Sequence, residues 1–184
     1  MKKRNLVIIA LIFISIISLN AQTFKKDNFV GNLTIGFGNA LYGSAYSSSF
    51  PPIAISGDYG IVDNVFDKGT IGIGGLIGYT SSKQNIYSDY SWSYTSIVIG
   101  PRGTIHYPFV DKLDTYAGLM IGYDIVSASS TGYNDGYNYT ASGSVAIFAG
   151  FVGARYYFND KIAGVCELGF GIAYFNIGIS YKIK

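Results

Sequence analysis

The chain is poor in charge, in cysteine and in histidine. Asp, Glu, Lys and Arg make up 13% of its 184 residues, whereas the hydrophobic types, with Tyr and Cys included, make up 49%. Because a water-facing surface needs more charge than this, the composition disfavours an ordinary soluble domain. The single Cys166 excludes an internal disulfide, and no group of Cys, His and Asp residues has the spacing of a metal site. We therefore expect neither a metal nor another cofactor.

The first 21 residues have the pattern of a secretory signal peptide. A basic start (Lys2–Arg4) precedes an apolar stretch at residues 6–19, and Ala21 offers a cleavage point. The stretch is shorter than the roughly 20 residues of a helical membrane span; an uncleaved inner-membrane anchor is the alternative. We expect residues 22–184 to form one domain. Removing the three basic residues of the leader leaves 10 of 13 Lys and Arg against 11 Asp and Glu, so no basic patch for nucleic acid remains.

Beyond the leader, apolar residues alternate with small or polar ones. In the last run Ile177, Ile179 and Ile183 share one face, and Gly178 and Ser180 lie on the other. A period of two predicts extended strands. Eight such runs occur, at residues 29–38, 53–61, 70–79, 94–107, 115–125, 145–158, 162–170 and 175–183.

Long and short connections alternate between the runs. The long polar stretches are 39–52, 81–92 and 127–142, and the short ones are 63–69, 108–114 and 159–160. Long loops on one side and short turns on the other are typical of outer-membrane barrels. The sequence therefore predicts an all-β fold, an eight-stranded antiparallel up-and-down transmembrane β-barrel. Gly100-Pro101 interrupts the fourth run and predicts a bulge or a register shift there.

Five ionisable residues fall on the strand face that points into such a barrel: Asp58, Arg102, His106, Arg155 and Glu167. An interior charge is costly unless it is paired, so we expect a polar network inside the lumen. In it, Glu167 pairs with Arg155 across neighbouring strands, and Arg102 approaches from farther round. A plug that fills the narrow interior is favoured over a gate. His106 has no evident nucleophile and orienter beside it, so no catalytic residues are expected.

Two of the polar stretches are rich in tyrosine. The first carries Tyr87, Tyr90 and Trp92, and the second carries Tyr133 and Tyr137. Tyr offers a large contact area at a small entropic cost, and it suits recognition together with Ser, Gly and Asn. These residues predict a loop surface that binds a glycan or a protein. An interfacial girdle with soluble loop tips is the alternative.

The stretch IGPRGTIHYPFVDKLDTYAGLMIGYD (residues 99–124) and the final strand carry a family resemblance. Asn176, Gly178, Tyr181 and Ile183 have the spacing of the barrel-assembly signal, polar-x-Gly-x-x-apolar-x-apolar. On these residues the chain resembles the small eight-stranded outer-membrane β-barrel family of the opacity and attachment-invasion type. Members of that family usually end on an aromatic residue, whereas Ile183 takes that place here.

The resemblance implies the outer membrane of a Gram-negative bacterium as the location, with outer-membrane lipid and the barrel-assembly machinery as partners. It also implies a function in adhesion, envelope integrity or limited permeation, and the fold alone does not determine which of these functions applies. Our first hypothesis is a structural or surface-interaction role without catalysis. A narrow channel is the second, and a soluble periplasmic β-barrel or sandwich binder is the third.

Overall fold

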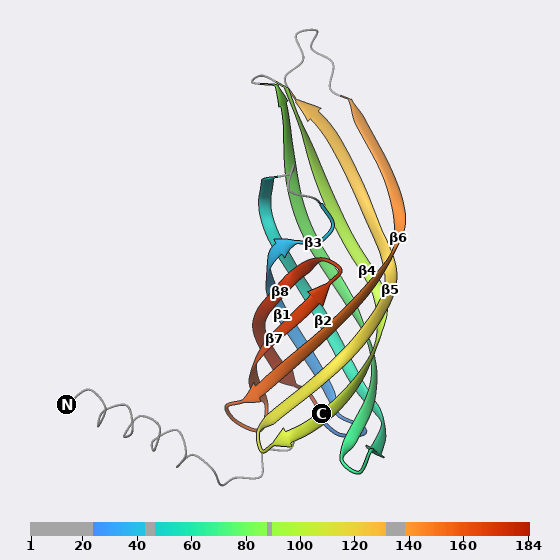
Figure 1. Cartoon of the computed structure of the whole chain (residues 1–184), viewed down its shortest axis with the longest axis vertical. Coiled ribbons are helices and arrows are strands. Elements are labelled where there is room, and N and C mark those ends of the chain that lie inside the picture. Colours follow the sequence, from blue (N-terminus) through green and yellow to red (C-terminus); the bar gives the residue numbers. More distant parts are fainter. Residues whose placement is uncertain (1–23, 43–46, 88–89, 132–138) are drawn as a thin grey trace, which may run out of the picture.

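The computed structural model describes residues 24–42, 47–87, 90–131 and 139–184. They form a closed barrel in which each strand is antiparallel to both neighbours (Figure 1). In barrel order the strands are β1 (Phe29–Asn39), β2 (Ser47–Val65), β3 (Gly69–Tyr87), β4 (Tyr90–Val110), β5 (Leu113–Thr131), β6 (Thr140–Tyr157), β7 (Ile162–Phe170) and β8 (Ala173–Lys182). Pairing of β1 with β8 closes the sheet. The predicted antiparallel up-and-down barrel is thereby confirmed.

The alternation of the sequence places apolar side chains on the outer wall. Leu33, Ile55 and Ile179 are each more than 60% exposed, whereas Asn32 and Ser56, next to two of them in the chain, are buried. Such a wall is stable against lipid and unstable against water. This finding contradicts the soluble binder. Among the described residues, no helix is long and apolar enough to cross a membrane.

The two ends of the barrel differ. Three short connections, at residues 66–68, 111–112 and 158–161, lie at the end where the chain also finishes, which we call the turn end. There the Phe29 N–H donates to the carbonyl of Lys184 at 3.0 Å, so the start of β1 is tied to the end of the chain. The opposite end, which we call the loop end, contains the short connection between β7 and β8.

The barrel wall is much taller on one side. β3, β4, β5 and β6 contain 19, 21, 19 and 18 residues, whereas β1, β7 and β8 contain 11, 9 and 10. The long strands extend beyond the short ones at the loop end (Figure 1). We call this extension, residues 80–87, 90–96, 125–131 and 140–149, the projecting sheet. The loops predicted at 39–52, 81–92 and 127–142 were too long, because the apolar alternation stops before the strand pairing does.

The bulge expected at Gly100-Pro101 is wrong. Gly75 pairs with Pro101 and Leu76 with Gly100 without a shift, and β4 keeps one register with β5 on both sides of this step. A Cβ added to Gly100 would lie 2.7 Å from the Cα of Gly122. The two glycines let β4 and β5 approach closely, so the strands pass the proline without an extra residue.

Candidate functional site

Arg155 lies inside the barrel, close to the turn end. Its Nη2 contacts Asp58 of β2, and its Nη1 lies 3.0 Å from Oδ2 of Asp114 on β5. Its Nε donates to the side-chain oxygen of Asn32 on β1 at 3.1 Å. Arg155 and Asp58 have no exposed surface. A charged guanidinium is stable in such a solvent-inaccessible position only when carboxylate and amide oxygens surround it.

Arg102 forms the second centre of this polar network. Its Nε lies 2.9 Å from Oδ1 of Asp58, and its Nη2 donates to Oε1 of Glu167 at 2.8 Å. Tyr116 donates its hydroxyl to the same Glu167 oxygen at 2.8 Å. Asp58 therefore bridges both arginines, and the network holds two guanidinium groups against the carboxylates of Asp58, Asp114 and Glu167.

The five residues singled out in the sequence are all buried in the barrel interior, but one expected pair is wrong. Arg155 pairs with Asp114 in place of Glu167, and Glu167 pairs with Arg102. In the sheet register Asp114 lies directly opposite Arg155, whereas Glu167 lies opposite Gly153. Sequence reasoning missed Asp114 because it assigned this residue to the turn before β5.

His106 joins the network to a buried hydroxyl. Its Nδ1 lies 2.9 Å from Oδ1 of Asp114, and its Nε2 lies 2.9 Å from Oγ1 of Thr104. The order of carboxylate, imidazole and hydroxyl resembles a hydrolase triad. All three residues are at most 5% exposed, however, and the Phe24 ring stacks on the imidazole at 4.0 Å. The arrangement therefore anchors the imidazole within the interior.

Aromatic rings fill the space around the two arginines. The Arg155 guanidinium lies 4.4 Å from the centre of the Tyr116 ring, and the Arg102 guanidinium lies 4.2 Å from that of Phe151. Both are cation–π distances. Gly153 leaves room for Tyr116, because a Cβ added there would lie 2.5 Å from the ring. The alternation placed Tyr116 on the inward face, but only the structure shows its contacts with Glu167 and the arginines.

An apolar layer closes the interior on the loop-end side of the polar network. It consists of Val98, Met120, Ala149, Ile172 and Ala173, all buried. Ile172 reaches it from the short β7–β8 connection, where Gly171 adopts a φ of 147°. A cavity of about 30 Å³ remains between network and layer, bordered by Arg102, Glu167 and Ile172 among others. It has room for little more than one water molecule, so the interior is packed at both levels.

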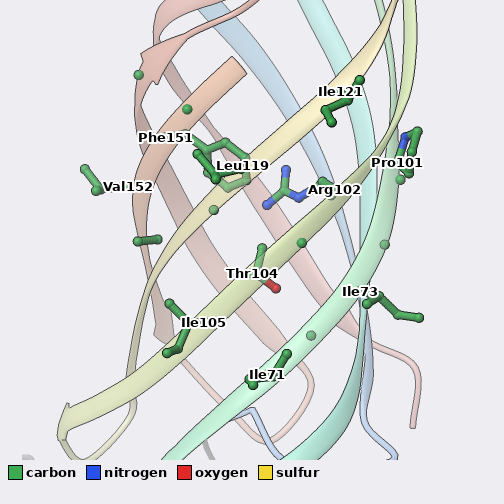
Figure 2. A pocket seen from close by; sticks show the side chains of 18 of the residues that line it. Ile71, Ile73, Pro101, Arg102, Thr104, Ile105, Leu119, Ile121, Phe151 and Val152 are labelled. Carbon is green, nitrogen blue, oxygen red and sulfur yellow. The ribbon is translucent and has the colours of Figure 1, made fainter. Parts of the chain in front are cut away.

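A shallow depression of about 1620 Å³ lies on the outer wall. Figure 2 shows Ile71, Ile73, Ile105 and Ile121 around it, with Arg102 among them. The isoleucines face outward, and Gly103 offers no side chain between them, since a Cβ there would meet nothing within 4 Å. Arg102 borders the depression from the interior, where carboxylates hold its guanidinium. Among the described residues, no group of three or more His, Cys, Asp or Glu could hold a metal ion.

The predicted recognition residues lie in strands where the structure describes them. Tyr87 ends β3 and pairs with Tyr90 at the start of β4, which also contains Trp92. Their assignment to a long loop was therefore wrong, because strand pairing continues beyond the point where the apolar alternation stops. Tyr133 and Tyr137 lie outside the described residues.

Alternate aromatic residues of β4 contact one another. Trp92 Nε1 donates to the Tyr90 hydroxyl at 2.9 Å, and the Trp92 and Tyr94 rings stack with centroids 6.4 Å apart. The three share the strand face on which Val98 is buried, so they lie on the inward, concave side of the projecting sheet. We call Tyr90, Trp92 and Tyr94 the aromatic ladder.

The residues that match the assembly signal lie on or just after β8. Tyr181 and Ile183 point outward and are 47% and 60% exposed, and Asn176 and Gly178 precede them on the strand. A Cβ added to Gly178 would lie 1.9 Å from the carbonyl oxygen of Leu33, so β8 passes close to β1 there. The spacing puts two apolar side chains on the lipid face of the strand that closes the barrel.

No protein-family model matches the chain, and no curated protein matches it in sequence. Solved structures do. The N-terminal β-barrel domain of OprF from Pseudomonas aeruginosa is 9% identical; the match covers 87% of this chain and 100% of that one, with a TM-score of 0.50. The fold is that of an outer-membrane barrel.

Two further solved structures match with lower scores. A designed transmembrane β-barrel is 14% identical, with 88% of this chain and 100% of that chain covered and a TM-score of 0.49. Ail, the attachment invasion locus protein of Yersinia pestis, solved with the heparin analogue sucrose octasulfate, is 11% identical, with 84% and 93% covered and a TM-score of 0.43. At such identities the likeness concerns the fold alone.

Proposed function

We propose that the chain is an outer-membrane β-barrel of the opacity and attachment-invasion type with a structural and surface-interaction role and no catalysis. In this proposal residues 1–21 are a cleaved signal peptide, the turn end faces the periplasm, and the loop end faces the outside. The partners are outer-membrane lipid, the barrel-assembly machinery during insertion, and a glycan or protein ligand at the surface. The observation that carries the proposal is the aromatic ladder on the projecting sheet.

The outward face of β4 supports the position of the projecting sheet outside the bilayer. Ile105, Ile99 and Ile97 are exposed on this face, and Thr95 and Ser93 follow them towards the loop end. Lipid favours the isoleucines and water favours the hydroxyls. The lipid boundary therefore lies near Ile97, and the ladder residues lie beyond it. Strand pairing on both sides of β4 continues there as far as Ser91, and the pairing with β3 then shifts register once, between Asn85 and Tyr87, so the surface is built on paired strands.

The aromatic ladder suits recognition. Its three rings are half-buried, so part of each is exposed to a sugar or to an apolar side chain, and aromatic side chains with a hydroxyl or indole group combine apolar contact with directional hydrogen bonds. The hydrogen bond between Trp92 and Tyr90 fixes two of the rings before a ligand arrives, which reduces the entropy lost on binding.

The packed interior favours this role over the narrow channel. Ions would have to cross the polar network and then the apolar layer, which leave between them a cavity of about 30 Å³. The buried state of Thr104, His106 and Asp114 likewise favours a role without catalysis. Because the interior is packed and these three residues are buried, we expect the protein to act through its loop-end surface.

Replacing Tyr90 and Trp92 together by Ser is expected to weaken ligand binding by at least tenfold while the barrel stays folded. The measurement is binding of the refolded barrel to glycan and matrix-protein arrays, with heat-modifiable gel migration as the test of folding. Loss of two stacking rings removes roughly 1–3 kcal/mol of contact energy, which corresponds to about tenfold or more in affinity.

Phe66→Ser is the matched control, because Phe66 is an exposed aromatic residue in a turn at the opposite end. It should leave binding unchanged. Equal array binding by wild type and the double variant would refute the ladder as the recognition surface. A wild-type barrel that binds nothing on either array would contradict the surface-interaction role.

A further inference from the structure

Asp124 is a buried carboxylate with no cation beside it among the described residues. It is 4% exposed and lies on β5 directly opposite Val98 of β4, on the inward face. The other three buried carboxylates of the described residues, Asp58, Asp114 and Glu167, each form an ion pair with an arginine. Because an unpaired buried charge is unfavourable, a cation beside Asp124 would stabilise the folded barrel.

One oxygen of the Asp124 carboxylate is open to a ligand, and the other is not. Ser96 donates its hydroxyl hydrogen to Oδ2 at 3.2 Å. Oδ1 is also buried, and it accepts no hydrogen bond from the described residues. Val98 and Val145, which lie opposite Asp124 on the two neighbouring strands, have apolar side chains and supply no donor. The lone pairs of Oδ1 therefore mark a position for a group from outside the barrel.

The polar side chains of this part of the interior direct their hydrogens elsewhere. An ionised carboxylate only accepts hydrogen bonds, so Ser96 donates to Asp124, and the Tyr42 hydroxyl in turn donates to Ser96 at 2.5 Å. The Asn39 amide nitrogen donates to the hydroxyl of Ser82 on β3 at 3.0 Å. The described groups thus offer Oδ1 of Asp124 no hydrogen, and a ligand group that only donates suits this position.

We propose that Asp124 binds a primary ammonium group that enters from the loop end, on a lysine side chain of a partner or on a free alkylamine. The inference deepens the proposed function and rests on it, because an outside partner reaches Asp124 only if the loop end faces the outside. An ammonium has three donors and no acceptor. Tyr42 and Tyr94 place two aromatic rings, with centroids 5.9 Å apart, beside Ser96, and aromatic rings attract cations.

Two other kinds of cation suit the position less well. A guanidinium binds a carboxylate best through both oxygens, but Ser96 already donates to Oδ2 of Asp124. A calcium ion takes about six or more oxygen ligands, whereas no group of three or more His, Cys, Asp or Glu among the described residues could hold a metal. A single available carboxylate oxygen matches the compact charge of an ammonium.

Val145 of β6 shows how a ligand reaches the carboxylate. It lies directly opposite Asp124 in the sheet register and shares its inward face, yet it is 55% exposed. Solvent therefore reaches the interior within one strand of Asp124. A narrow alkyl chain can lie along Val145 with its ammonium at Oδ1, in the way that lysine stems cover apolar surface.

The test is a titration of the refolded barrel in micelles with n-butylammonium, followed by backbone amide chemical shifts. The amides of Ser96, Asp124 and Val145 should shift together and saturate. 1-Butanol has the same alkyl chain without the charge and should not cause these shifts. n-Butylguanidinium should bind more weakly than n-butylammonium, because only one carboxylate oxygen is available.

Variants decide whether the carboxylate is the binding group. Asp124→Asn keeps the shape of the side chain but removes its charge, and it should weaken n-butylammonium binding by at least about tenfold. Asp67→Asn is the matched control, because Asp67 is an exposed carboxylate in a turn at the opposite end; it should bind as wild type does. Ser96→Ala leaves Oδ2 available and should shift the preference towards n-butylguanidinium, whereas an unchanged preference would contradict selection by Ser96.

Nα-acetyl-lysine amide distinguishes the two sources of the ammonium. Saturable binding of this compound at the same three amides assigns the site to a lysine side chain of a protein partner. Binding of n-butylammonium alone assigns it to a free alkylamine.

Two outcomes overturn the proposal. One is equal binding of n-butylammonium by wild type and Asp124→Asn, and the other is the absence of saturable shifts with either amine. Array binding separates this inference from the proposed function. Intact array binding without amine binding refutes the ammonium site alone, whereas amine binding by a barrel that binds nothing on the arrays refutes the surface-interaction role alone.

Discussion

Asp58→Asn is expected to lower the free energy of unfolding by about 3–5 kcal/mol. Asp58 contacts both arginines of the polar network, and it has no exposed surface. The substitution keeps the shape of the side chain but leaves two buried guanidinium groups with one carboxylate each, Glu167 for Arg102 and Asp114 for Arg155. The measurement is the urea concentration at which the folded, heat-modifiable band of the refolded protein disappears.

Double-mutant cycles then map the pairing inside the barrel. Asp58→Asn combined with Arg155→Gln should lose less than the sum of the single losses, because the orphaned partner is gone. Arg102→Gln with Glu167→Gln should behave in the same way. Arg155→Gln with Glu167→Gln should be closer to additive, since these two residues bind different partners. The reverse ranking of the three cycles would contradict the pairing described here.

Asp124→Asn is the matched control for Asp58. Asp124 is also a buried carboxylate, and it accepts a hydrogen bond from Ser96 at 3.2 Å. Among the described residues it takes part in no ion pair. Its neutralisation should therefore change stability much less than that of Asp58. Equal losses at both positions would show that burial, and not the bridge between two arginines, decides the effect.

Tyr181→Asp is expected to abolish insertion into the outer membrane. Tyr181 is on the lipid face of β8 and lies opposite Gly31 of β1 and Ile162 of β7, so it sits where the barrel closes. A carboxylate there faces lipid and replaces one of the apolar positions of the proposed assembly signal. The measurement is the amount of folded, heat-modifiable protein in the outer-membrane fraction.

Tyr174→Asp is the control on the same strand. Tyr174 is 57% exposed, lies at the loop end of β8 and is outside the signal spacing, so the variant should assemble. Ile183→Phe with Lys184 deleted should assemble at least as well as wild type, because it restores an aromatic end. Normal levels of folded Tyr181→Asp protein would count against the assembly role of these residues.

The alternation of apolar with small or polar residues was sufficient to predict the fold. In the lipid-spanning part, residues such as Ile55, Ile77 and Ile179 must face outward, so their spacing determines strand identity and face. Outside the lipid this constraint ends. Residues 81–85 and 140–144 are polar or small on both faces and still pair as strands, so a reading of hydrophobic periodicity assigned them to loops.

Alternation also showed which charged residues point inward, but it could not show their partners. In a narrow interior, side chains from distant strands meet: Arg155 of β6 contacts Asp58 of β2. Asp114 was missed because it is the second residue of β5 and lies beside a turn, and Phe24 was missed because it precedes the first strand and belongs to no alternating run. Such contacts depend on the three-dimensional packing of long side chains, which no spacing rule contains.

The polar network and the apolar layer close the interior of the barrel, and we propose that the protein acts through its loop-end surface. Conductance of the refolded barrel in planar lipid bilayers tests it most directly, with folding verified by heat-modifiable migration. The polar network and the apolar layer predict a current indistinguishable from that of the bare bilayer. Steady unit steps of current from the folded wild-type protein would contradict the account and support the channel.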